Sequence, residues 1–252
     1  MDLGISEKCA IVTGGASGIG LCTAGFLQRE GASLLIADRN PEALASAADK
    51  LKADGAQVET FQLDVRDAEQ CRAMVAAAVR SFGAVDILVN SAGIGGDLSL
   101  FAETTPEQWK DLIDINLGGV LNCCHAVSSH MIERRTGKIV SLASEAGRGN
   151  EKRIVVYGAT KGGVISFTRG LALELGRFSI NVNCVCPGVT HSPMTSYLKE
   201  SEELEARFAS AYPLGRLGVP EDIAPMITFL CSDRASWITG QAISVSGGFG
   251  RS

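Results

Sequence analysis

The chain has 252 residues, 46% of them hydrophobic and 20% charged, so it can bury a large core. Its formal net charge is −5 with no basic cluster, which argues against a protein that binds a nucleic-acid backbone. No apolar run approaches the roughly 18 residues of a membrane span, and the first residues lack the pattern of a secretory signal. We therefore expect a cytoplasmic protein with no membrane or nucleic-acid partner.

Short apolar runs alternate with longer segments of helical period along the chain. The expected strands are 8–13, 33–38, 57–63, 85–90, 138–143, 180–186 and 242–246, and the expected helices are 18–30, 41–53, 67–82, 106–135, 155–177 and 220–231. Near-continuous apolar strands suit a parallel sheet that is covered on both faces. This pattern predicts an α/β fold: one doubly wound, Rossmann-like domain over residues 1–252, with a seven-stranded parallel sheet and helices on both faces.

The first expected strand runs into TGGASGIG, Thr13 to Gly20, just before an expected helix. Glycines at 14, 18 and 20 let a ligand approach the backbone, and free N–H groups at a helix start favour a phosphate. The spacing differs from the G-x-G-x-x-G of the standard dinucleotide fingerprint. Its place between strand and helix nevertheless predicts a phosphate-binding turn.

Asp38 ends the second expected strand, where a carboxylate can bind both ribose hydroxyls of an adenosine and repel a 2′-phosphate. Arg39 beside it could instead bind that phosphate through its positive charge. Asp38 could also cap the helix that begins near Pro41. We expect Asp38 to dominate over Arg39, because the phosphate would lie within hydrogen-bonding distance of it. The sequence therefore predicts NAD as the preferred cofactor.

Eight cysteines mostly lie in apolar runs, and the chain has only three histidines. Buried, reduced thiols are expected in a cytosolic protein. A metal site would need further Cys or His ligands at set spacings, so we predict no metal.

Residues 157–161 read YGATK, which places Tyr157 and Lys161 on one face of an expected helix. A tyrosine acts as a base near neutrality only if its pKa falls from ~10 by about 2–3 units. A cation at ~4 Å supplies about 4 kcal/mol at an effective dielectric of ~20, so one lysine suffices. An ordinary surface Tyr–Lys pair fits these two residues equally well.

The segment 188–212 interrupts the alternation and is predicted to be a substrate lid, although a plain surface helix fits as well. Met194, Tyr197 and Leu198 would either cover an apolar substrate or pack on the body of the protein. His191 would cap a turn or touch substrate, and we favour the turn. Three cations before Tyr157, namely Arg148, Lys152 and Arg153, either recognise an acidic group or are solvated or subunit-contact charges, which we favour.

Taken together, these motifs resemble the short-chain dehydrogenase/reductase family over nearly the whole chain. TGGASGIG matches T-G-x-x-x-G-x-G, NSAG at 90–93 resembles N-N-A-G, and Ser144 stands thirteen residues before Tyr157 in a Y-x-x-x-K motif. Asn116 in INLGG and CPG at 186–188 also match. Ser91, Ser192 and Ser246 depart from the family pattern.

The resemblance implies a catalytic set in which Tyr157 is the general acid/base, Lys161 lowers its pKa, Ser144 binds the substrate oxygen and Asn116 holds a relay water. It further implies cofactor contacts at Gly14, Ser17, Gly18, Ile19, Gly20, Asp38, Arg39, Asp64, Val65, Asn90, Ala92, Gly93, Tyr157, Lys161, Pro187, Gly188, Val189 and Thr190.

The expected function is that of an NAD-dependent oxidoreductase that interconverts a secondary alcohol and a ketone. The substrate would be hydrophobic, cyclic or a hydroxyacyl thioester; the alternative is a 3-oxoacyl-ACP/CoA reductase of lipid metabolism. A non-catalytic nucleotide sensor would have no use for all four catalytic residues. The resemblance also implies a homotetramer or homodimer built on the helices at 106–135 and 155–177.

Overall fold

The computed structural model describes residues 2–53, 55, 57–149 and 151–250. Within these ranges the strands are β1 (Cys9–Thr13), β2 (Ser33–Asp38), β3 (Val58–Gln62), β4 (Ile87–Asn90), β5 (Gly137–Leu142), β6 (Ile180–Pro187) and β7 (Ala242–Val245). The helices are α1 (Gly18–Arg29), α2 (Pro41–Ala53), α3 (Ala68–Phe82), α4 (Pro106–Ile113), α5 (Gly119–Arg134), α6 (Val155–Leu175), α7 (Glu202–Ala209) and α8 (Pro220–Leu230).

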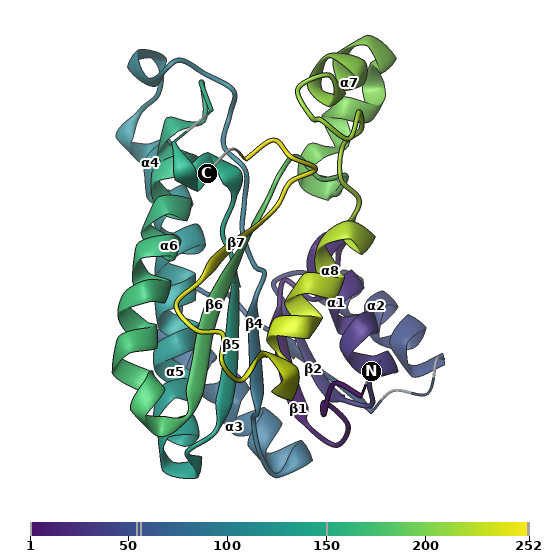
Figure 1. Ribbon diagram of the computed structural model, residues 1–252, viewed down its shortest axis with the longest axis vertical. Helices are drawn as coiled ribbons and strands as arrows, with labels where there is room; N and C mark the ends of the chain where they lie inside the picture. Colours follow the sequence, from purple (N-terminus) through teal and green to yellow (C-terminus); the bar gives the residue numbers. More distant parts are fainter. Residues whose placement is uncertain (1, 54, 56, 150, 251–252) are drawn as a thin grey trace.

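The strands form one parallel sheet in the order β3-β2-β1-β4-β5-β6-β7 (Figure 1). Val12 in β1 pairs with Ile36 on one side and with Val89 on the other. The chain therefore winds outward in both directions from β1 and β4. In such a sheet, ligands bind at the carboxyl ends of the strands where the order reverses. The predicted seven-stranded doubly wound sheet is confirmed.

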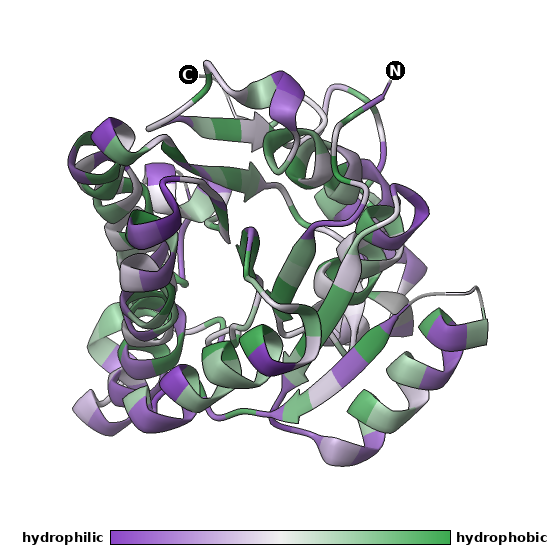
Figure 2. Cartoon of the chain, turned by 90° about the horizontal axis from the view of Figure 1, so that it is seen from below, coloured by the Kyte–Doolittle hydropathy of each residue, from purple (hydrophilic) through white to green (hydrophobic). Residues whose placement is uncertain are grey.

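Two apolar clusters cover the two faces of the sheet (Figures 1 and 2). Helices α3, α5 and α6 pack on one face, and α1, α2 and α8 pack on the other. Ile11 belongs to the first cluster and its neighbour Val12 to the second, because successive strand side chains point to opposite faces. Both are fully buried, which explains why the strands are apolar without alternation.

All eight cysteines are free thiols, and all but the half-buried Cys22 are buried. Burial raises the pKa of Cys124 and of Cys231 to about 12, so these thiols behave as core side chains. Within the described ranges, no group of three or more Cys, His, Asp or Glu residues is placed to hold a metal ion. None of the described helices combines the length and the apolar character that crossing a membrane requires.

The helix expected over 106–135 is present without a break from Pro106 to Arg134, and a π-helical turn at Asp114–Gly118 joins α4 to α5 within it. The turn places Asn116 in the interior, where its Oδ1 accepts from Ile94 N at 2.8 Å and its Nδ2 donates to Ile94 O at 2.9 Å. Gly119 follows, and a Cβ there would lie 2.5 Å from Val65 Cγ2. The turn thus fixes two loops at the carboxyl edge of the sheet.

Candidate active site

A cavity of about 700 Å³ opens at the carboxyl ends of the strands, the size of a site for a cofactor and a small substrate. It is lined by most of the residues singled out from sequence: Gly14, Ser17, Gly18, Ile19, Asp38, Arg39, Asp64, Val65, Ala92, Gly93, Ser144, Tyr157, Lys161, Pro187, Gly188, Val189 and Thr190. The structure therefore brings together residues from seven separate stretches of the chain.

Gly20, Asn90 and Asn116 do not line this cavity. The side chain of Asn90 turns into the sheet, where Nδ2 donates to Ser141 Oγ at 3.1 Å, and Ser91 reaches the cavity in its place. Both polar atoms of the Asn116 amide are bound to Ile94. The Asn90 side chain thus contacts the neighbouring strand β5, and the Asn116 side chain holds the backbone of Ile94.

The glycine turn presents bare backbone to the cavity. Gly14 has φ +63°, and a Cβ on it would lie 2.8 Å from Ala92 N. Thr13 Oγ1 accepts from Ser91 N at 3.2 Å and from Ala92 N at 3.3 Å, which ties the turn to the loop after β4. Ser17 precedes α1 without a side-chain capping bond, so N–H groups of the first turn stay available to a phosphate. The turn fits the diphosphate of a dinucleotide.

Gly20→Ala should displace the glycine turn, because the added Cβ would lie 2.2 Å from Gly14 O, a backbone atom. We expect a loss of about 1–3 kcal/mol in the free energy of unfolding and weaker dinucleotide binding. Denaturant unfolding and fluorescence titration measure the two effects. Gly25→Ala in the same helix is the matched control: its Cβ would meet only Leu51 at 4.0 Å, and we expect no loss of stability. Equal stability and equal dinucleotide affinity of the two variants would contradict the close contact between Gly20 and the Gly14 carbonyl.

Asp38 does not cap α2. Asn40 does so, since its Oδ1 accepts from Glu42 N at 2.9 Å and from Ala43 N at 3.1 Å. Asp38 Oδ1 accepts a 3.2 Å bond from Asn40 N, and the half-buried carboxylate lines the cavity next to the exposed Arg39. A carboxylate at this place suits the ribose hydroxyls of an adenosine. The capping alternative is therefore wrong.

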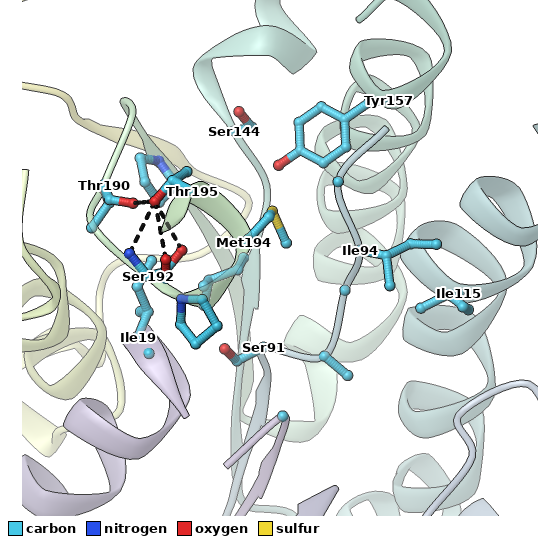
Figure 3. Close-up of a pocket in the computed structure, with 18 of the residues that line it drawn as sticks. Ile19, Ser91, Ile94, Ile115, Ser144, Tyr157, Thr190, Ser192, Met194 and Thr195 are labelled. Carbon is cyan, nitrogen blue, oxygen red and sulfur yellow. Dashed lines mark hydrogen bonds between the residues drawn. The ribbon is translucent and has the colours of Figure 1, made fainter. Parts of the chain in front are cut away.

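The reactive end of the cavity is built by the segment after β5 and the first turns of α6. Ser144 Oγ accepts from Ala146 N at 3.1 Å, which fixes the short turn that follows it. Tyr157 and Lys161 share one face of α6, as their spacing predicted, and the hydroxyls of Ser144 and Tyr157 lie close together in Figure 3. Lys161 is 5% exposed, and its Nζ donates to Leu142 O at 2.8 Å.

In the ligand-free protein the pKa of Tyr157 is raised. Loss of water around the phenol is the main cause; the charge of Glu151 adds to it, and a hydrogen bond with Ser144 opposes it. Lys161 Nζ lies 5.8 Å from the centre of the Tyr157 ring and is engaged by Leu142 O. Burial lowers the pKa of Lys161 itself to about 8. In the ligand-free protein, burial outweighs the neighbouring cation.

The segment over the cavity comprises a 3₁₀ stretch, Pro193–Glu200, and α7, which stands beyond the strand ends in Figure 1. Met194 and Tyr197 line the cavity, whereas Leu198 is buried in a small cluster with Tyr212 and Leu217. Met194 and Tyr197 are thus placed to contact a ligand in the cavity, whereas Leu198 packs on the body of the protein. Thr195 Oγ1 donates to Thr190 O at 2.8 Å and anchors the segment (Figure 3).

His191 and the three cations before Tyr157 do not line the cavity. The His191 ring bonds Glu205 Oε1 at 3.1 Å, a contact that joins the start of the lid segment to α7 within the same segment. Arg148 turns inward and its Nη2 donates to Ala242 O at 2.6 Å, while Lys152 and Arg153 are exposed. The hypothesis that one of these cations reads an acidic substrate group has no support in this geometry.

Several lining residues were not singled out from sequence. They include the loop 94–98, which follows β4, together with Ile115, Ile154, Thr195 and Phe208. The loop could have been found, because residues just after a parallel strand border the same crevice. Phe208 had no such signal, since it reaches the cavity only through the packing of α7.

A family model described as Enoyl-(Acyl carrier protein) reductase matches residues 14–250. A (2S)-[(R)-hydroxy(phenyl)methyl]succinyl-CoA dehydrogenase subunit BbsD of Thauera aromatica is 38% identical over 98% of this chain and 98% of its own. A 3-oxoacyl-[acyl-carrier-protein] reductase FabG of Chlamydia muridarum is 40% identical over 96% and 97%.

Among solved structures, an actinorhodin polyketide ketoreductase variant crystallised with NADPH has a TM-score of 0.94 at 37% identity, covering 97% of this chain and 98% of its own. The family match, the parallel sheet and the grouping of Ser144, Tyr157 and Lys161 agree with one another. This chain belongs to the short-chain dehydrogenase/reductase family of oxidoreductases.

Proposed function

We propose that this oxidoreductase interconverts a secondary alcohol and a ketone, with Tyr157 transferring the proton. The observation that carries the proposal is the convergence of Ser144, Tyr157 and Lys161 on one cavity, whose other end holds the glycine turn and Asp38. A nicotinamide dinucleotide bound along that cavity would supply the hydride acceptor or donor. The names of the relatives, a hydroxyacyl-CoA dehydrogenase and 3-oxoacyl reductases, belong to the same reaction class.

In the oxidative direction, Tyr157 accepts the alcohol proton while Ser144 holds the substrate oxygen by a hydrogen bond. Lys161 holds positive charge near the phenol and favours its ionised form. Asn116 acts through Ile94, whose backbone it fixes at the wall of the cavity. The glycine turn, Asp38 and the segment 187–190 would hold the dinucleotide.

The substrate end of the cavity is largely apolar. Its walls include Ile94, Leu98, Ile154, Met194, Tyr197 and Phe208. We propose a hydrophobic, cyclic or hydroxyacyl-thioester substrate on this basis. The names of the relatives favour the thioester class, and a 3-oxoacyl-ACP/CoA reductase is the second candidate.

We further propose NAD as the preferred cofactor, because the Asp38 carboxylate would repel a 2′-phosphate. At about 4 Å and intermediate dielectric, this repulsion is worth roughly 2 kcal/mol or more, about 30-fold in kcat/KM. Assays of reduced-nicotinamide absorbance with NAD⁺ and NADP⁺, over cyclic, aliphatic and hydroxyacyl-thioester alcohols, test the reaction and the preference together. Asp38→Ser should raise kcat/KM for NADP⁺ and lower it for NAD⁺, whereas Glu42→Gln on exposed α2 should change neither. Preference of the wild type for NADP⁺ would overturn the assignment.

We also propose one catalytic domain over the whole chain, with a lid at about 188–212, that works in the cytoplasm as a homotetramer or homodimer. Free, buried thiols suit a reducing compartment. Exposed apolar side chains on α5, on α6 and before β7 support assembly: Leu121 is 38% exposed, Leu173 86% and Trp237 99%.

A further inference from the structure

A half-buried carboxylate, that of Glu151, lines the substrate end of the cavity. Glu151 lies in the loop between the turn after Ser144 and helix α6, and it lines the same cavity as Ser144 and Tyr157. It is half-buried, while its neighbours Lys152 and Arg153 are exposed and lie outside the lining. The charged side chain of this loop that lines the cavity is therefore an acid. One interpretation of the sequence instead has a cation of this loop binding an acidic group of the substrate, but those cations lie outside the lining.

The charge of Glu151 is not neutralised by a nearby cation. No ion pair of Glu151 is found in the described part of the chain. Among the described residues, the cations that line the cavity as a whole are Arg39 and Lys161. Arg39 follows β2, three strand spacings or about 14 Å from β5. Lys161 is bound to Leu142 O. The described acids of the lining at this end are Glu151 and, at the exposed mouth, Asp97.

The field of Glu151 reaches the groups that face it from α6 and from the lid. Burial is the main cause of the raised pKa values of Tyr157, Tyr197 and Tyr212, and the charge of Glu151 adds to each; burial and the nearby Glu145 raise the pKa of Glu151 itself. The lining of the cavity at this end also includes the apolar side chains of Ile154 and Met194. A partly desolvated carboxylate among apolar side chains favours a ligand that donates a hydrogen bond to it, and disfavours a second anion.

We propose that Glu151 determines substrate specificity: the preferred alcohol or ketone carries a hydrogen-bond donor, a hydroxyl or ammonium group, near the reacting carbon, and substrates with a carboxylate there are rejected. This inference rests on the proposed alcohol–ketone reaction. It specifies a second, polar group of the substrate in addition to the apolar part that the walls of the cavity would contact.

A matched set of ketones tests the proposal. Cyclohexanones would carry a methyl, hydroxymethyl, aminomethyl or carboxylate group at the ring carbon two bonds from the carbonyl carbon, and kcat/KM would be normalised to the methyl compound. In the wild type we expect the hydroxymethyl and aminomethyl compounds to exceed the carboxylate by at least about tenfold. Glu151→Gln, which keeps the shape and removes the charge, should raise the normalised carboxylate value and lower the aminomethyl value, each by about tenfold.

Glu203→Gln is the control, because it removes an equal charge from the exposed face of α7 outside the cavity lining; it should shift each ratio less than about twofold. A second readout is the pH profile of alcohol oxidation, which should move to lower pH in Glu151→Gln, since a negative charge near Tyr157 has been removed. Thermal unfolding checks that the variant folds, and Glu151→Ala repeats the test should it not.

The outcomes separate the two proposals. If the wild type reduces the methyl compound and Glu151→Gln leaves all normalised ratios unchanged, the role of Glu151 is refuted and the reaction class stands. If the wild type reduces none of the ketones or thioesters with either cofactor, the proposed function fails and this inference fails with it.

Discussion

Replacing Tyr157 by phenylalanine should lower kcat for alcohol oxidation by about 10²- to 10⁴-fold, the contribution of a positioned general acid/base. The variant removes one hydroxyl from a half-buried ring in the first turns of α6. Cofactor affinity should change less than about threefold, and the free energy of unfolding by about 1 kcal/mol, the value of one hydrogen bond. Steady-state kinetics, cofactor titration and denaturant unfolding provide the three readouts.

Tyr197→Phe is the matched control for this experiment, because Tyr197 lines the same cavity from the lid and its pKa is also raised by burial. Loss of that hydroxyl should change kcat less than about tenfold, since it is not required to carry the proton. Wild-type turnover in the Tyr157 variant, or equal losses in the two variants, would remove Tyr157 from the chemistry.

Replacing Lys161 by methionine should have the second-largest effect. At the 5.8 Å that separates Nζ from the ring centre, one charge contributes about 3 kcal/mol at an effective dielectric of ~20. That energy corresponds to about 2 units of the Tyr157 pKa, so the ionised fraction at neutral pH should fall by about 10². The Lys161 ammonium also supports the Leu142 carbonyl at 2.8 Å, so some stability should be lost as well.

The loss of rate in Lys161→Met should be larger at neutral pH than at alkaline pH. Burial lowers the pKa of Lys161 from 10.5 to about 8, so in the ligand-free protein its charge is present below about 8 and lost above it. The difference in rate between wild type and Lys161→Met should therefore be large near neutrality and shrink above that pH. Lys152→Met, at an exposed position outside the cavity lining, should match the wild type at every pH. A constant difference across the range would point to a purely structural role.

Features encoded within one element or one turn could be predicted from sequence. The glycine turn, Asp38 at the end of β2 and the shared face of Tyr157 and Lys161 depend on local spacing and on strand polarity. The sheet was predictable because strands buried on both faces are almost wholly apolar.

Features set by contacts between distant segments could not be predicted. The π-helical turn contains Asn116, whose Oδ1 accepts a hydrogen bond from Ile94 N in a loop far from it in sequence. The Asn90 side chain donates to Ser141 on the neighbouring strand. Arg148 is drawn inward by the Ala242 carbonyl on β7. The raised pKa of Tyr157 arises from burial and from Glu151, neither of which the spacing of YGATK contains. Fold and candidate residues were thus accessible from sequence, while the electrostatics of the site required the structure.

A single-turnover pH profile would test most directly whether the cation beside Tyr157 makes it a competent base. The rate of reduced-nicotinamide formation would be followed from a preformed cofactor complex, in the wild type and in Lys161→Met. We expect the wild-type rate to reach half its maximum below the ordinary tyrosine pKa of ~10, and the midpoint to rise by about 2 units in the variant. Coincident midpoints in the two proteins would contradict the account.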